Sequence, residues 1–155
     1  MVEDAFSDYD PRVLSPEVFD FVLTNELKRA IRSQNFLTLL VVEPTPRNAE
    51  GERKELAREL AHVISRVVRE TDILSPGEDG RLSVVLLDAD YQNSMHVVDR
   101  LMSRVEHYEF TTPAAISVGA ACCPTHGADL ASLRSVAESR PVQTRRAPRG
   151  NSNAQ

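Results

Sequence analysis

This sequence of 155 residues has few cysteines, and it lacks long apolar runs and an excess of positive charge. The only cysteines, Cys122 and Cys123, are adjacent, which makes a structural disulfide implausible and is typical of a reducing compartment. The longest apolar run, residues 36–42, is far too short to cross a bilayer, and the acidic start Met-Val-Glu-Asp is unlike a secretory signal. We therefore expect a cytoplasmic protein that is not inserted into a membrane.

The charge balance argues against a nucleic acid polymer as the partner. The formal net charge is −5, whereas broad binding of DNA or RNA depends on a basic surface that neutralises phosphates. Lys28 and Lys54 are the only lysines, so arginine supplies nearly all of the positive charge. The composition leaves room for a local basic patch only.

The length is sufficient for one compact domain with its own core. We expect residues 1–13 to be a flexible lead or a docking strand, because they are acidic and have few periodic apolar positions. Residues 14–140 hold the periodic segments and should form the folded domain. Residues 141–155 are rich in Arg, Pro, Gly, Asn and Ser, and are expected to be a disordered tail.

Apolar periodicity predicts helices and strands in alternation. Ser15 can cap a helix that spans residues 16–33, and further helices are expected over residues 56–70, around 95–105 and over 130–139. Short apolar runs at 36–42, 72–75, 82–87 and 114–122 predict strands. The Asp-Gly pair between the second and third strands favours a tight hairpin turn. This order predicts an α/β (α+β) fold in which helices pack on a central, mainly antiparallel sheet.

Three stretches in this order carry a family resemblance. The first strand ends at Glu43, residues 69–87 contain the hairpin with its approach, and Ile116-Ser-Val-Gly119 lies in the last strand. Together they resemble the GGDEF family of diguanylate cyclases, which join two GTP molecules into cyclic di-GMP. The resemblance covers about residues 14–139, and it implies a GGDEF-like sheet related to the nucleotidyl cyclase and palm folds.

The resemblance also implies that the catalytic positions have changed. The five signature positions are occupied by Glu78, Asp79, Gly80, Arg81 and Leu82. In the family, carboxylates at the third position and at the end of the first strand hold divalent metal. Here Glu43 has lost that partner to Gly80, Arg81 replaces the next acid, and the segment after Glu43 is shortened. We therefore expect no catalytic residue, no bound metal, no cofactor and no cyclase activity.

A shift of the alignment by one residue would place Asp79 at the metal position, with Gly77 and Glu78 at the glycine positions. The same shift would move Arg81 into an apolar position and reverse the side-chain faces of the strand at 82–87. The hydrophobic pattern of that strand opposes the shift, so we interpret residues 77–80 as a hairpin turn whose chemistry has been discarded.

A second motif of the family is retained before the hairpin. Many members carry an inhibitory site for cyclic di-GMP, Arg-x-x-Asp, five residues before the signature, and Arg69-Glu-Thr-Asp72 has this spacing. A further arginine from the next helix completes that site, and its position is Arg100. Guanidinium groups can bond the O6 and N7 edge of guanine or contact phosphate, and a carboxylate can accept from guanine N1 and N2. Arg66 and Arg104, one helical turn away, could widen the patch.

Simpler interpretations stay open. Arg69 and Asp72 could be an ordinary surface ion pair at a helix end, with Arg100 solvated. A zinc site of Cys122, Cys123 and His126 lacks a fourth ligand at a suitable spacing.

These observations lead to three hypotheses. The first is a non-enzymatic cyclic di-GMP receptor that signals through a protein partner, with ligand-linked homodimerisation. The second is a nucleotide-independent interaction scaffold, and the third is residual cyclase activity that uses Glu43 and Asp79.

Overall fold

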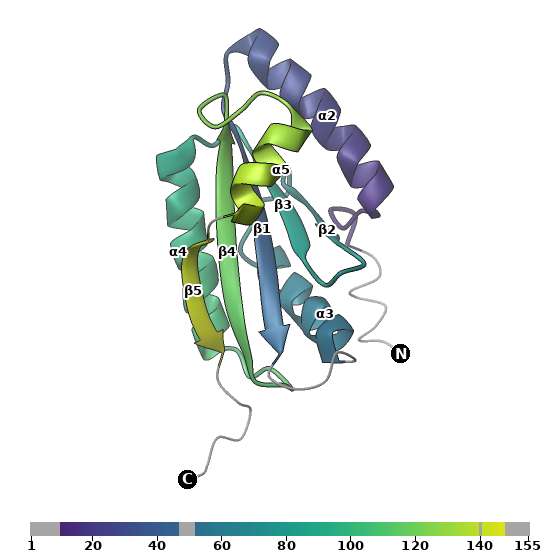
Figure 1. Cartoon of the computed structure of the whole chain (residues 1–155), viewed down its shortest axis with the longest axis vertical. Coiled ribbons are helices and arrows are strands. Elements are labelled where there is room, and N and C mark those ends of the chain that lie inside the picture. The colour runs from purple at the N-terminus through teal and green to yellow at the C-terminus, as the bar shows by residue number, and fades with distance from the viewer. Residues whose placement is uncertain (1–9, 47–51, 140, 148–155) are drawn as a thin grey trace.

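The computed structural model describes residues 10–46, 52–139 and 141–147 and places them in four helices and five strands. The order along the chain is α2 (Pro16–Ser33), β1 (Leu37–Pro46), α3 (Glu52–Ser65), β2 (Ile73–Pro76), β3 (Leu82–Leu87), α4 (Tyr91–His107), β4 (Ala114–Cys123), α5 (Leu130–Ser139) and β5 (Pro141–Ala147). Figure 1 shows α5 in front of the sheet and α3 and α4 behind it. No helix in the described ranges is both long enough and apolar enough to span a membrane.

The five strands form one antiparallel sheet in the order β2-β3-β1-β4-β5. In the middle of the sheet, Leu40 of β1 lies opposite Val84 of β3 and Ala120 of β4. The predicted α/β fold with an antiparallel sheet is confirmed. The central position of β1 explains why five of its first six residues, 37–42, are apolar.

The sheet separates two hydrophobic clusters because successive side chains of a strand point to opposite faces. Leu40 and Val42 belong to the cluster under α3 and α4. Leu39 and Val41 belong to the cluster under α2 and α5. All four side chains are buried, and loss of one such leucine side chain costs about 2–5 kcal/mol of stability.

Local signals in the sequence set the limits of α2. The Ser15 side chain accepts a hydrogen bond from the Val18 amide at 3.3 Å, and Pro16 occupies the first turn. Gln34 ends the helix in the left-handed conformation with φ of 59°. The predicted helix over residues 16–33 is confirmed, and its four buried residues are Phe19, Leu23, Leu27 and Ala30.

Residues 10–13 dock beside the sheet, as the second alternative for this segment predicted, and do not form a flexible lead. Val13 pairs in parallel with Leu74 of β2, and the Leu14 amide donates to the Leu74 carbonyl at 2.9 Å. The Leu74 amide donates to the Arg12 carbonyl, also at 2.9 Å. These hydrogen bonds fix the segment beside the edge of the sheet, so order begins before Leu14. The rest of the expected lead, residues 1–9, lies outside the described residues.

The expected disordered tail was wrong for residues 141–147, which form β5. The strand pairs with β4 and leans on α4, where Gln143 bonds Asp99 and Arg145 forms an ion pair with Glu106. This strand is held by polar side chains and by backbone pairing, and not by buried apolar residues. Its composition therefore predicted disorder. Residues 148–155 lie outside the described part of the chain.

The other predicted limits differ by a few residues. The helix expected over residues 56–70 ends at Ser65, whose hydroxyl donates to the His62 carbonyl at 2.8 Å. A hydroxyl that bonds the preceding turn competes with continuation of the helix. Beyond it, residues 66–72 form the turns that lead into β2.

Candidate functional site

The hairpin between β2 and β3 has a defined turn geometry. The Gly77 amide donates to the Arg81 carbonyl at 2.7 Å, and the Gly80 amide donates to the Gly77 carbonyl at 3.1 Å. Gly80 has φ of +90°, a conformation that residues with side chains rarely adopt. Asp79 accepts from the Arg81 amide at 3.0 Å, so its carboxylate is used within the turn. The predicted tight turn at Asp79-Gly80 is confirmed.

Gly80 is also confined by helix α3. A Cβ atom at position 80 would lie 2.5 Å from Cγ of Arg53, which belongs to α3. A carboxylate side chain here would need both a strained backbone and a displaced Arg53.

Arg81 lies among three carboxylates at the end of this hairpin. Its Nε lies 3.4 Å from Glu43 of β1, and its Nη1 lies 3.8 Å from Asp79 and 3.7 Å from Glu138 of α5. We call these four residues the Arg81 network. The guanidinium therefore takes the place between Glu43 and Asp79 that a bound cation would need. In the described ranges, no group of three His, Cys, Asp or Glu side chains could hold a metal ion.

Asp72 is buried, and its carboxylate accepts hydrogen bonds from backbone amides. Only 2% of its side chain is exposed. One carboxylate oxygen accepts from the Arg69 amide at 2.9 Å, and the other accepts from the Leu87 amide at 3.2 Å. The carboxylate thus fixes the turn that precedes β2 to the end of β3. We call residues 69–72 the Arg69 turn.

Arg69 and Arg100 each anchor one guanidinium nitrogen on a backbone carbonyl near this turn. Nη2 of Arg69 donates to the Leu87 carbonyl at 2.6 Å, and its Nε lies 3.8 Å from Asp72, while 62% of the side chain is exposed. Nη2 of Arg100, on α4, donates to the Val67 carbonyl at 2.8 Å. Because Val67 lies two residues before Arg69, both predicted arginines are held at one corner of the domain, around residues 66–72, each by one hydrogen bond to backbone.

The outer predicted residues are less constrained. Arg66 follows the end of α3, and Arg104 lies one turn after Arg100 on α4. Both residues are exposed, and within the described ranges neither side chain forms a hydrogen bond or an ion pair.

Sequence reasoning missed Arg12, which supports the same corner. Its guanidinium donates to the carbonyls of Ser65 at 2.9 Å and of Val68 and Arg69 at 3.3 Å each. It also pairs with Asp10 at 2.8 Å, and this hydrogen bond holds the pKa of Asp10 below its usual value and raises that of Arg12. No local pattern could have indicated contacts between residues more than 50 positions apart.

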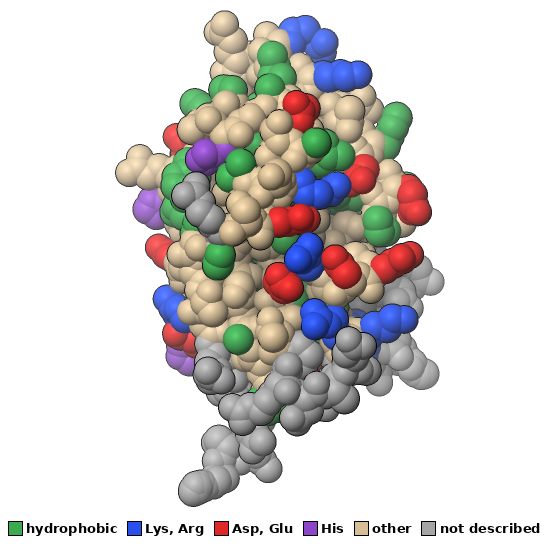
Figure 2. Space-filling view, viewed as in Figure 1, with side chains coloured by type: hydrophobic (Ala, Val, Ile, Leu, Met, Phe, Trp, Pro, Cys, Tyr) green, Lys and Arg blue, Asp and Glu red, His purple; other side chains and the backbone are tan. Residues whose placement is uncertain are grey.

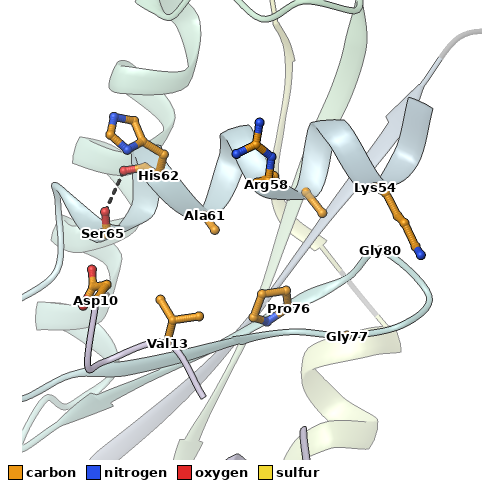
Figure 3. A pocket seen from close by; sticks show the side chains of 11 residues that line it. Asp10, Val13, Lys54, Arg58, Ala61, His62, Ser65, Pro76, Gly77 and Gly80 are labelled. Carbon is orange, nitrogen blue, oxygen red and sulfur yellow. Dashed lines mark hydrogen bonds between the residues drawn. The ribbon is translucent and has the colours of Figure 1, made fainter. Parts of the chain in front are cut away.

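An apolar pocket of about 420 Å³ lies between α3, the hairpin and the segment that contains Val13. Figure 3 shows Ala61 facing this pocket, while Arg58 and His62 extend away from the hairpin. Pro76, Gly77 and Gly80 form the opposite wall. Only Lys54 extends toward the hairpin with a charged group (Figure 3).

The cysteines complete the last long strand, as expected. Cys122 and Cys123 are buried and unpaired at the end of β4, and burial raises the pKa of the Cys123 thiol. His126 accepts from the Cys122 amide at 2.9 Å, which gives its ring a structural role.

Comparison with known proteins identifies the fold. No protein-family model and no curated protein matches the sequence. The GGDEF domain of TpbB (YfiN) from Pseudomonas aeruginosa is 17% identical over 84% of this chain and 83% of that chain, with a TM-score of 0.69. A DGC protein from Thermotoga maritima is 15% identical over 83% and 98%, with a TM-score of 0.70.

A third similar structure is the coiled coil and GGDEF domain of DgcB from Caulobacter crescentus in complex with c-di-GMP. It is 14% identical over 87% of this chain and 78% of that chain, with a TM-score of 0.63. At these identities the similarity concerns architecture alone. The chain therefore has the fold of GGDEF domains.

Proposed function

We propose that this protein is a non-enzymatic receptor for cyclic di-GMP, which binds at the Arg69 turn and signals through a protein partner. The observation that carries the proposal is the anchoring of Arg69 and Arg100 at one corner of the domain. Each guanidinium uses one N–H to hold its position on backbone carbonyls. Such anchored groups lose less rotational freedom when a ligand binds.

The chemistry of this corner suits the ligand. Cyclic di-GMP offers two guanines and two phosphates, and guanidinium groups bond both kinds of acceptor in pairs. Arg66 and Arg104 add positive charge beside the anchored pair. In this proposal Asp72 organises the Arg69 turn, because its oxygens already accept from two backbone amides.

The geometry of the hairpin supports a role without catalysis. Gly80 stands where the family's metal-binding carboxylate would be, and its φ and its distance from Arg53 oppose any side chain there. Glu43 and Asp79, the carboxylates available to a residual cyclase, both pair with Arg81. Incubation with GTP and Mg²⁺ should therefore yield no cyclic di-GMP, and detection of the product would restore the cyclase hypothesis.

Calorimetric titration with cyclic di-GMP tests the binding proposal. We expect saturable binding that weakens by about tenfold or more in Arg69→Ala, since a hydrogen bond to a charged group contributes about 1.5–3 kcal/mol. Arg29→Ala is a matched control. The substitution removes the same charge, and Arg29 pairs with Glu26 on α2. Absence of binding at high micromolar ligand, or equal affinity in Arg69→Ala, would contradict the assignment.

A second candidate is an interaction scaffold that does not use a nucleotide. Val18 and Phe21 on the outer side of α2 are 47% and 68% exposed, and such side chains are enriched where proteins meet. A partner retained by the native protein and by Arg69→Ala, with or without cyclic di-GMP, but lost in Phe21→Ser, would favour this candidate.

A further inference from the structure

A polar cavity of about 500 Å³ lies on the face of the sheet that carries α2 and α5. The first turns of α2, the hairpin and α5 surround it. Figure 2 shows acidic and basic side chains gathered over this part of the molecule. The cavity is separate from the Arg69 turn, whose residues do not line it.

Two serines replace apolar residues on the floor of this cavity. Ser75 of β2 lies opposite Ser83 of β3, which lies opposite Val41 of β1. The next row on the same face is apolar, since Ile73 pairs with Val85. The floor therefore changes from apolar to polar toward the hairpin.

The hydroxyl of Ser75 is buried without a partner. The residue is 3% exposed, and its Oγ forms no hydrogen bond within the described residues. A buried polar group that lacks a partner costs about 1–3 kcal/mol. Because Ser75 lines the cavity, a ligand could supply the missing hydrogen bond.

The walls of the cavity carry an excess of negative charge. Two guanidinium groups line it, and both are already paired with carboxylates: Arg134 with Asp20 at 2.9 Å, and Arg81 within its network. Five carboxylates line it, from Glu17, Asp20, Glu78, Asp79 and Glu138, which leaves a net charge of −3. A cationic ligand is favoured, and nucleoside triphosphates are repelled.

The arrangement of the carboxylates selects the kind of cation. In the described ranges, no three acidic or imidazole side chains converge on one point where a single ion could sit. Charges spread over several walls are matched by a ligand whose own charges are spread along a chain. We propose that this cavity binds a polyamine, with its ammonium groups on the wall carboxylates and one N–H donated to Ser75 Oγ.

Spermidine is the probe, titrated into the full-length chain at fixed ionic strength. We expect saturable binding with one molecule per chain. N1,N8-diacetylspermidine has lost both terminal charges and should not bind, and Mg²⁺ should not compete with spermidine at equal charge concentration. Failure of spermidine to bind at millimolar concentration, or equal binding of the diacetyl compound, would overturn the proposal.

Variants separate the cavity from general attraction to an acidic protein. Glu138→Gln should weaken spermidine binding about threefold to fivefold, the range of a partly exposed charge pair. Glu26→Gln is the control, because it changes the net charge equally and also removes a carboxylate paired with arginine. Glu26 lies away from the cavity, so the affinity for spermidine should be unchanged. Equal weakening in both variants would indicate diffuse attraction and contradict the proposal.

Ser75→Ala gives a readout that a purely structural serine would not. Removal of a buried hydroxyl without a partner should raise the melting temperature by about 2–4 °C. It should also weaken spermidine about tenfold, because a hydrogen bond from a charged donor is lost. A more stable variant with unchanged spermidine affinity would contradict the role of Ser75.

Cyclic di-GMP titrations should be the same in native protein, Glu138→Gln and Ser75→Ala, so the two proposals can fail independently.

Discussion

The Arg69 turn and the Arg81 network use the same residue types in opposite ways. At the Arg69 turn the carboxylate of Asp72 is buried on backbone amides, and the guanidinium of Arg69 stays exposed. At the hairpin the guanidinium of Arg81 is shared among three carboxylates. Backbone hydrogen bonds, more than residue composition, therefore decide which charged groups remain available to a ligand.

The two regions also differ in the contacts that hold them in the fold. The Arg69 turn is held by Arg12, Asp72 and the end of β3. The Arg81 network joins β1, the hairpin and α5 through partly exposed side chains. We therefore expect substitutions at the Arg69 turn to affect stability more strongly than substitutions in the Arg81 network.

Asp72→Ala should have the largest effect. It leaves the Arg69 and Leu87 amides without their acceptor and should lower the free energy of unfolding by about 3 kcal/mol. Urea denaturation measures this change. Asp129→Ala is a control, because Asp129 accepts from the Ser132 amide at an exposed helix start, where the loss of stability should be smaller. Equal losses would mean that burial of Asp72 contributes nothing.

Gly80→Glu should follow, with a loss of about 2 kcal/mol. The substitution places a carboxylate at the position that the predicted alignment assigns to a metal ligand, but it forces a side chain onto a residue with φ of +90° and against Arg53. Thermal unfolding measures the loss, and chromatography after incubation with GTP and Mg²⁺ should still detect no cyclic di-GMP. A stable variant that makes the product would contradict this expectation.

Asp10→Asn should remove about 1–2 kcal/mol at neutral pH by breaking the pair with Arg12. The pKa of Asp10 is lowered in the folded state by its hydrogen bond to Arg12. Its stabilisation is therefore fully present above the unfolded pKa of about 3.9. It is lost as the pH falls through the lower folded value. Urea denaturation at several pH values should show native protein and variant converging in acid, and a constant difference would contradict this account.

Arg81→Gln should have the smallest effect, about 1 kcal/mol or less at physiological salt, because the groups of the network are partly exposed. Without the guanidinium, Glu43, Asp79 and Glu138 repel one another. The loss should therefore grow as the ionic strength falls. Melting temperatures measured over a salt series provide the test. A difference from native protein that does not depend on salt would argue against an electrostatic role.

The fold was predictable wherever burial follows a regular period. The limits of α2, β3 and α5 were predicted to the residue, because Phe19, Leu23 and Leu27 mark one helix face and caps or prolines mark the ends. The strand β5 was missed because Gln143 and Arg145 hold it through partners on α4 that are distant in sequence.

The candidate site stays a prediction, and the structure adds contacts that the sequence could not give. Spacing selected Arg69, Asp72 and Arg100, and the structure anchors the two arginines on the carbonyls of Leu87 and Val67. The sequence could not indicate that Asp72 would be buried on the Leu87 amide, since that contact depends on how β3 ends. Nor could it indicate Arg12, whose acceptors are carbonyl groups that every residue carries.

The most direct test of the account is a calorimetric comparison of native protein with the double variant Arg69→Ala/Arg100→Ala, each titrated with cyclic di-GMP at the same salt concentration. We expect saturable binding by native protein and none by the double variant, while both proteins unfold cooperatively. Equal affinity in the two proteins, or no binding by native protein, would contradict the claim that these exposed guanidinium groups form a receptor site.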